Sequence, residues 1–444
     1  MMKPEPSSSY PSRGQPRAFL LSAILLLVVC LPAGVQAQQT VTLDEAINFA
    51  LARNPSYAEA EISVDNARDT RRMAVGAFLP TLSLGTGVSA RPGSVFDPTT
   101  QAQISATDRS FTGGLSVGMD LFAGGRNRAE LSRAAVEIEA ADASLEGQRF
   151  QLILQTKQLF FGALEQGDLL EVAQARVRRA EESLELVRRQ VAVGAATASD
   201  SLRTRLELAN ARQSALQTEA QLRAARMSLG RQIGASEPVQ AFPPADLSPS
   251  PLPLADEEIY RIAELSSPDV RASQLYARAN ESSLISARAA YLPTARISSG
   301  YNWSNHEWEF GGGEGRWNGL SLSLSYSLFN GFSRESSVAR AENQLFISRL
   351  QEDDTRLQAR QEADAALFAI RTAEQAVEIA EEAVLVAGED LRVVLERYGV
   401  GVATVFEVVT SQIALDEAEA GRVWTRYDYL IARAELESLL GREL

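Results

Sequence analysis

The chain carries one five-residue stretch twice, as Ala77-Phe78-Leu79-Pro80-Thr81 and as Ala290-Tyr291-Leu292-Pro293-Thr294. Two further stretches return in the same order. Asp120-Leu121-Phe122-Ala123-Gly124 returns as Ser327-Leu328-Phe329-Asn330-Gly331, and Val193-Gly194-Ala195-Ala196-Thr197 returns as Val400-Gly401-Val402-Ala403-Thr404. The copies lie about 207 to 213 residues apart, which indicates that half of the protein is duplicated. We therefore expect two structural repeats, at 38–234 and 255–444, joined by a proline-rich linker at 235–254.

Each Leu-Pro step is followed by a change from helical to strand periodicity. Apolar residues alternate with Ser and Gly from Thr81 to Ala90, and the alternation returns along 115–121, 296–303 and 320–328. Such alternation predicts strands of about ten residues with one apolar face and one small, polar face. Small residues on a wet face, with aromatic residues near the loops, are typical of a membrane barrel around an aqueous lumen.

The strands are predicted to form two hairpins, at 80–122 and 294–329, with polar, Gly-rich tips at about Arg91 to Ser110 and Asn305 to Arg316. Two charged residues, Asp120 and Arg296, lie on the polar face near the helix end of their strands. We expect them to face the lumen and to be close enough to pair across the strands.

The stretches that follow the hairpins are strongly helical. Residues 125–192 and 332–398 contain no proline and are dense in Ala, Leu, Glu, Gln and Arg, which are strong helix formers. At 1.5 Å per residue, each helix would run roughly 100 Å. A turn and a return helix follow each of them, at 198–233 and 405–441.

The N-terminal segment 1–37 is predicted to be a signal peptide. Basic residues precede the apolar stretch 18–32, and Val35-Gln36-Ala37 offers small residues for cleavage. The only cysteine, Cys30, lies inside this segment, so the mature chain is expected to have no thiol chemistry. The formal net charge of −14 disfavours nucleic acid as a partner.

Motifs that carry chemistry do not stand out in the sequence. His306 is the only histidine, and one histidine supplies no set of metal ligands. The glycine-rich stretches 311–315 and 399–401 lack the residues or the preceding strand of a nucleotide-binding loop. We therefore expect no enzymatic activity, no cofactor and no metal site.

The strand count predicts the assembly. Four strands cannot close a barrel, and an open sheet edge in lipid leaves backbone groups unsatisfied. Three copies supply twelve strands, whereas the eight strands of two copies would enclose no channel. We therefore expect an α+β membrane protein, a homotrimer with a 12-stranded β-barrel in membrane lipid that is continued by a barrel of long α-helices.

The order of these motifs resembles the TolC-type outer-membrane efflux protein family. The likeness rests on Thr42-Leu43-Asp44-Glu45-Ala46, Asn54-Pro55, the Leu-Pro before each hairpin, the Leu-Phe-x-Gly after it, and the two Val-Gly-x-x-Thr turns. It implies an outer-membrane protein of a Gram-negative bacterium with a helical barrel in the periplasm. It further implies a passive exit duct that works with a periplasmic adaptor and an inner-membrane transporter, and it leaves the cargo open.

The resemblance also assigns roles to residues of the two turns. It implies a periplasmic tip that docks the adaptor, formed by Val193, Gly194, Thr197, Val400, Gly401 and Thr404. Asp200 and Glu407 match acidic residues near the closed aperture, where threefold symmetry would gather them into a ring and like charges would raise their pKa values. Ala403 stands where the family pattern has an arginine, so this chain departs from the family's gate.

A periplasmic adaptor is the alternative from a different class of protein. An adaptor would have one helical hairpin flanked by compact, β-rich domains. This sequence predicts two helical hairpins with strands at the opposite ends, which favours the duct.

Overall fold

The computed structural model describes residues 40–99, 101–244, 247–305 and 313–444. The expected signal peptide at 1–37 and His306 lie outside these residues. Within them, no helix combines the length and the hydropathy that crossing a membrane requires.

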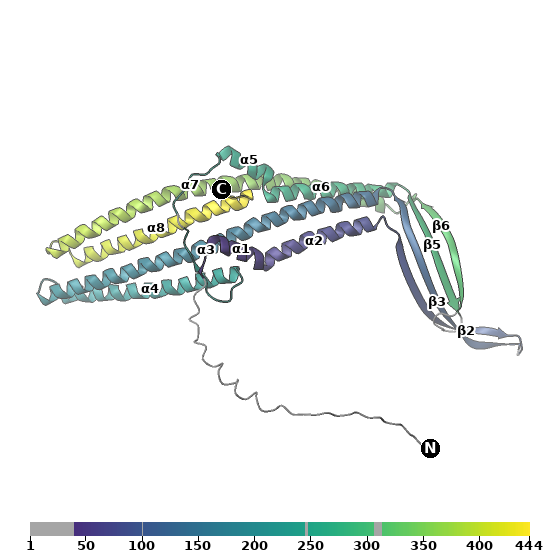
Figure 1. Ribbon diagram of the computed structural model, residues 1–444, viewed down its shortest axis with the longest axis horizontal. Helices are drawn as coiled ribbons and strands as arrows, with labels where there is room; N and C mark the ends of the chain where they lie inside the picture. Colours follow the sequence, from purple (N-terminus) through teal and green to yellow (C-terminus); the bar gives the residue numbers. More distant parts are fainter. Residues whose placement is uncertain (1–39, 100, 245–246, 306–312) are drawn as a thin grey trace, which may run out of the picture. The chain divides into compact units, whose positions relative to one another are not determined.

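Four strands form one antiparallel sheet in the order β2-β3-β5-β6 (Figure 1). Their bounds are β2 Thr81–Asp97, β3 Ala102–Ala123, β5 Thr294–Asn305 and β6 Glu314–Ser325. Because β3 pairs with β5, the two hairpins form a single sheet, and β2 and β6 remain as its edges.

The first hairpin is longer than the alternation predicted. β2 and β3 pair throughout the region expected to be a tip, with Arg91 opposite Asp108 and Asp97 opposite Ala102, so that expectation is wrong. The physical reason is that two strands satisfy each other's backbone groups without an apolar face, and the pattern of side chains therefore misses the extension. β6 is shorter than predicted and ends at Ser325, because its partner strand β5 begins at the opposite residue, Thr294.

The long helices pack side by side in the order α4-α3-α8-α7 (Figure 1). Their bounds are α3 Arg126–Ala192, α4 Ala198–Gln232, α7 Ser333–Gly399 and α8 Val405–Leu440. α3 contacts both α4 and α8, and α8 contacts α7. α4 and α7 are therefore the edge helices of this layer.

Proline sets the breaks between the shorter helices. Their bounds are α1 Leu43–Arg53, α2 Pro55–Gly76, α5 Asp256–Ser266, α6 Pro268–Arg288 and the 3-10 helix η1 Ala289–Tyr291. A proline disfavours helix in the residue before it, so α1 ends before Pro55 and α5 before Pro268. α2 packs on α3, and α6 packs on both α3 and α7.

The main core lies midway along the helices. One cluster contains Ile259, Ile370 and Leu436 from α5, α7 and α8, and another contains Phe160 and Leu229 from α3 and α4. The proline-rich linker takes part in this core. Its strand β4 (Gln240–Ala241) pairs with β1 (Thr40–Val41), and the Tyr429 hydroxyl donates a hydrogen bond to the carbonyl of Ser250 at 2.8 Å.

Candidate functional site

The two turns that reverse the long helices have the same geometry. Gly194 and Gly401 both adopt a φ of 78°, a conformation that residues with a Cβ rarely adopt. The space around both positions is open, and the neighbouring Val193 and Val400 are 79% and 77% exposed. Both turns lie at the end of the helices away from the sheet (Figure 1). They present apolar, accessible side chains to any partner at that end.

Thr197 and Thr404 cap the return helices in the same way. Each hydroxyl accepts a hydrogen bond from the amide three residues on, at Asp200 or Glu407, and each of these carboxylates accepts one from the threonine amide. The hydroxyl and amide of Thr197 hold the pKa of Asp200 below its usual 3.8, and Arg203 contributes less. Within one chain, the pKa of Asp200 is therefore lowered, and the upward shift expected from a ring of carboxylates stays a prediction for the trimer.

A small apolar cluster lies beneath the turns. It comprises Val187, Val394, Tyr398, Ala403, Val405 and Val408. Ala403 is 8% exposed in this cluster, so a long charged side chain at that position would disrupt the packing. Arg397, on the neighbouring helix, lies 3.7 Å from Glu407 and supplies an arginine beside that carboxylate although position 403 has none.

Tyr398 belongs to this site and was missed by the sequence analysis. Its side chain is 6% exposed, and its hydroxyl has no hydrogen-bond partner among the described residues. Burial raises its pKa, and the charge of Asp200 raises it further. The guanidinium of Arg203 on α4 also lies over the ring of Phe406 on α8, 5.8 Å from its centroid, so the two turns form one site.

The sheet separates an apolar face from a small, polar face. Five residues of the edge strands are between 67% and 74% exposed on the apolar face: Leu82, Leu84, Leu320, Leu322 and Leu324. On the opposite face, Ser83 and Ser116 hydrogen bond across the strands at 2.7 Å. An exposed apolar face of this kind marks a surface that meets lipid or another protein.

Asp120 and Arg296 occupy opposite positions on β3 and β5, on the polar face. Their side chains form a salt bridge of 2.8 Å and remain 32% and 52% exposed. Gly118 leaves the space that the guanidinium fills, because a Cβ at that position would lie 2.8 Å from Arg296. The pair is accessible from the polar side of the sheet, near the ends of the strands that lead into the helices.

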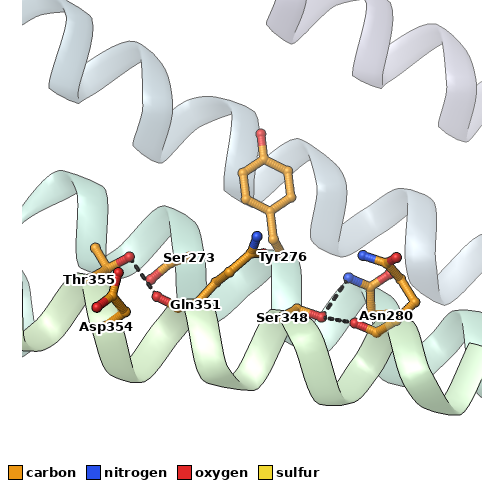
Figure 2. A pocket seen from close by; sticks show the side chains of 8 residues that line it. Ser273, Tyr276, Asn280, Ser348, Gln351, Asp354 and Thr355 are labelled. Carbon is orange, nitrogen blue, oxygen red and sulfur yellow. Dashed lines mark hydrogen bonds between the residues drawn. The ribbon is translucent and has the colours of Figure 1, made fainter.

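A polar groove with a volume of about 530 Å³ lies between α6 and α7 (Figure 2). Asn280 donates to the Ser348 hydroxyl at 2.9 Å, and that hydroxyl donates to the carbonyl of Gln344. The groove is lined mainly by hydroxyl and amide groups, with Asp354 as its one carboxylate. In the described part of the chain, no group of three or more His, Cys, Asp or Glu residues is placed to hold a metal ion.

A ladder of polar pairs ties α3 of the first repeat to α8 of the second. Its hydrogen bonds join Gln412 to Ser183 at 2.8 Å, Arg179 to Asp416 at 2.5 Å, and Tyr427 to Asp168 at 2.9 Å. Lys157 and Glu437 form a further pair. The members of this ladder are far apart in the chain and look like ordinary surface residues of separate helices, so the ladder could not be predicted from the sequence.

Comparisons with known proteins agree with this architecture. The sequence profile of the family described as "Outer membrane efflux protein" matches residues 46–235 and 259–442. The probable efflux pump outer membrane protein TtgC of Pseudomonas putida is 22% identical over 402 residues, which cover 90% of this chain and 82% of TtgC. The alkaline protease secretion protein AprF of Pseudomonas aeruginosa is 24% identical over 426 residues, which cover 89% of this chain and 84% of AprF.

The fold is also that of solved outer-membrane proteins. The structure of VceC from Vibrio cholerae matches with a TM-score of 0.74 at 18% identity, over 90% of this chain and 96% of VceC. The family profile spans both hairpins of strands and all the long helices. The chain therefore belongs to the outer membrane efflux protein family, whose members are exit channels in the outer membrane of Gram-negative bacteria.

Proposed function

We propose that three copies of this chain form the closed exit duct of a tripartite export system. The observation that carries the proposal is the four-stranded sheet with an exposed apolar face and two edge strands, β2 and β6. In lipid, each edge must find a partner strand, because unpaired backbone groups cost several kcal/mol each. Pairing of β6 with β2 of the next copy closes a 12-stranded barrel, with the apolar face toward lipid and the Ser and Gly face toward the lumen.

The helices continue the duct on the periplasmic side. α4 and α7 are edges of the helical layer as β2 and β6 are edges of the sheet, so the same threefold arrangement closes both parts. The salt bridge of Asp120 and Arg296 lies on the lumen side in this arrangement and narrows the passage near the junction of strands and helices.

The paired turns form the docking tip for a periplasmic adaptor that connects the duct to an inner-membrane transporter. The support is geometric, because Val193, Gly194, Val400 and Gly401 lie at the end of the helices with open space around the glycines. Thr197 and Thr404 fix the direction of the return helices behind them. The names of TtgC and AprF link those two relatives to an efflux pump and to protease secretion, and both activities need such a connection.

Asp200 and Glu407 ring the aperture in this proposal. The low pKa of Asp200 keeps its carboxylate charged at neutral pH, so three copies of it favour cations at the mouth of the duct. The duct itself performs no chemistry, and the energy for export comes from the transporter. The family match and the exposed sheet favour this function over the periplasmic adaptor that the sequence left as an alternative.

The proposal is tested on protein extracted from outer membranes in detergent. Light scattering with the detergent contribution subtracted should give three chains per particle, and planar-bilayer recordings should show stepwise conductance. A stable monomer without channel activity would overturn the proposal, because one chain cannot close the barrel.

A further inference from the structure

The edge helices carry exposed apolar side chains along their length, whereas the inner helix α8 exposes two large ones, Phe406 at 63% and Trp424 at 49%. α4 exposes Leu202 at 66%, Leu216 at 67% and Met227 at 42%. α7 exposes Phe368 at 72%, Ile379 at 67%, Val386 at 62% and Val393 at 38%. By contrast, α3 exposes no large apolar side chain along its described length from Arg126 to Ala192, although it is longer than α4. The outer sides of the layer are therefore the unpartnered surfaces.

One subset of the exposed residues has matching spacing on the two helices, and Leu206 of α4 and Leu357 and Leu385 of α7 are exposed outside that subset. On α7 the steps from Val393 to Val386, Ile379 and Phe368 are seven, seven and eleven residues. On α4 the steps from Leu202 to Ala209, Leu216 and Met227 are also seven, seven and eleven, in the opposite direction along the chain. Steps of seven and eleven return to nearly the same side of a helix, so each set forms one stripe. Two such stripes match when the helices run antiparallel.

The contact of α3 with α8 inside the chain shows how such helices meet. Its hydrogen-bonded pairs keep one antiparallel register. From Ser183–Gln412 to Arg179–Asp416, the residue number falls by four on α3 and rises by four on α8. From there to Asp168–Tyr427, it falls by eleven on α3 and rises by eleven on α8. Apolar pairs follow the same register. Val172 packs against the core cluster that contains Val423, and Leu186 and Val409 both pack against the cluster beneath the turns.

The duplication transfers this register to the edge helices. The residue separation between Val193 and Val400 relates α3 to α7 and α4 to α8, whose turns have the same geometry. When this separation is added to the α3 residue and subtracted from the α8 residue of the pair Val172–Val423, the corresponding pair is Ile379 and Leu216. Applied to Leu186–Val409, the separation yields Val393 and Leu202. Continued along the same register to Phe161 and Ala434, it yields Phe368 and Met227. The two stripes thus fall into the transferred register, whereas the exposed Leu206 and Leu385 fall opposite Glu389 and Asn210.

One pair of charged residues, and one apolar pair at the end of the helices nearer the sheet, also fit this register. Ser183–Gln412 transfers to Asp390 and Arg205, which are exposed and oppositely charged. Nearer the sheet, Ala140 of α3 packs in one cluster with Leu275 of α6. The separation between Leu79 and Leu292 relates α2 to α6, and the transferred pair is Ile347 with Ile62, which are 45% and 58% exposed.

We infer that α7 of one copy packs antiparallel on α4 of the next copy in this register. Ile379 lies against Leu216 of the partner subunit, Val393 against Leu202 of the partner subunit, and Phe368 against Met227 of the partner subunit. Asp390, which also accepts a hydrogen bond of 2.6 Å from the Ser411 hydroxyl of its own chain, lies opposite Arg205 of the partner subunit. The inference rests on the proposed trimer and specifies its helical interface, with a second copy of this chain as the occupant of both stripes.

Cysteine pairs at four of these positions test the register. Two matched chains carry Ile379→Cys with Leu216→Cys, and Val393→Cys with Leu202→Cys. Two exchanged chains carry the same substitutions in the other combinations, Ile379→Cys with Leu202→Cys, and Val393→Cys with Leu216→Cys. Packed helices lie about 8–10 Å apart, which a short bis-maleimide spans, whereas the exchanged pairs are displaced by about 21 Å along the helix.

Protein in isolated outer membranes is cross-linked and separated under denaturing conditions. The matched chains should give at least tenfold more multi-chain product than the exchanged chains, and chains with a single cysteine should give none. Efficient linkage of the exchanged pairs, or of neither set, in particles that light scattering shows to hold three chains would overturn the register and leave the trimer standing. Single chains in light scattering would instead overturn the proposed function.

Discussion

Arg179 holds two carboxylates of α8 at once, and its removal is expected to weaken the contact between the two repeats. Its guanidinium lies 2.5 Å from Asp416 and 2.8 Å from Glu419, whose side chains are 9% and 20% exposed. Burial raises the pKa of Asp416 even with Arg179 and Arg176 beside it, so the loss of hydration outweighs the attraction. Arg179→Val removes the closer arginine and leaves both carboxylates in place.

The expected loss in the free energy of unfolding depends on the ion pairs that remain after Arg179→Val. Removing one partner of a buried ion pair typically costs about 3–5 kcal/mol, because a charge is left without compensation. Asp416 keeps Arg176 at 3.2 Å, and neither carboxylate is fully sealed from water. We therefore expect Arg179→Val to lower the free energy of unfolding by about 2–3 kcal/mol per chain, at or below the lower end of that range.

A second change should recover most of this loss. Asp416→Ala removes the more deeply buried carboxylate, and Arg176 keeps Glu207 at 2.6 Å. Because an ion pair replaced by apolar residues is often close to neutral, the double variant Arg179→Val with Asp416→Ala should lie within about 1 kcal/mol of the unchanged chain. The duplication supplies a precedent, since the corresponding positions are Val386 and Ala209.

Thermal unfolding of the purified, detergent-solubilised protein, followed by helical circular dichroism, measures these differences. With an unfolding entropy of about 2 cal/mol/K per residue, 1 kcal/mol moves the midpoint of a chain of this length by about 1 °C. Arg179→Val should lower the midpoint by about 2–3 °C, and the double variant should restore it. The neighbouring, exposed Arg178→Val is the matched control. A double variant as unstable as the sum of its single changes, or an Arg179→Val no worse than Arg178→Val, would refute the reasoning.

Three further predictions concern the tip. Gly194→Val with Gly401→Val should strain each turn by about 1–2 kcal/mol and abolish export while trimers persist, with the helical Gly388→Ala as control; normal efflux would place docking elsewhere. The Thr197–Asp200 cap should stabilise α4 above the usual Asp pKa of 3.8 and lose this effect as pH falls through the lowered pKa. The protection of the first-turn amides, which is the slowing of their hydrogen exchange relative to the intrinsic rate at each pH, should then decrease on acidification, but not in Asp200→Asn. The same loss of protection in that variant would contradict the assignment. Asp200→Asn with Glu407→Gln should reduce cation selectivity in planar bilayers, and an unchanged preference would move the filter to Asp120 and Arg296.

Local signals in the sequence were sufficient for much of the fold. The absence of helix breakers placed one long helix at 125–192, and the structure has it at Arg126–Ala192. The order of the repeated motifs predicted the efflux family, which the profile match confirms. Such features depend on neighbouring residues along the chain, and periodicity reports them directly.

Features that depend on distant residues were not predictable in this way. The pairing of Arg179 with Asp416 requires knowledge that α3 packs on α8, and the buried hydroxyl of Tyr398 requires the packing of both turns. One missed feature did have a local signal. Thr197 and Thr404 are each followed three residues later by an acidic residue, which is the capping-box pattern that Thr42 and Glu45 also form. The assignment of Asp200 and Glu407 to the aperture alone overlooked their role as caps.

The two kinds of helix contact solve different physical problems, and we interpret their residues accordingly. α3 and α8 belong to one chain, so their contact need not offset the entropy lost when separate molecules associate, and it can use ion pairs that contribute little net stability. A contact between copies must offset that loss, and apolar burial at roughly 25 cal/mol per Å² is the more dependable source of free energy. The contact inside the chain has the charged residues Arg179 and Asp416, and the corresponding contact between copies has Val386 and Ala209. This difference is what we expect of a duplicated chain in which one copy of the contact is internal and the other joins subunits.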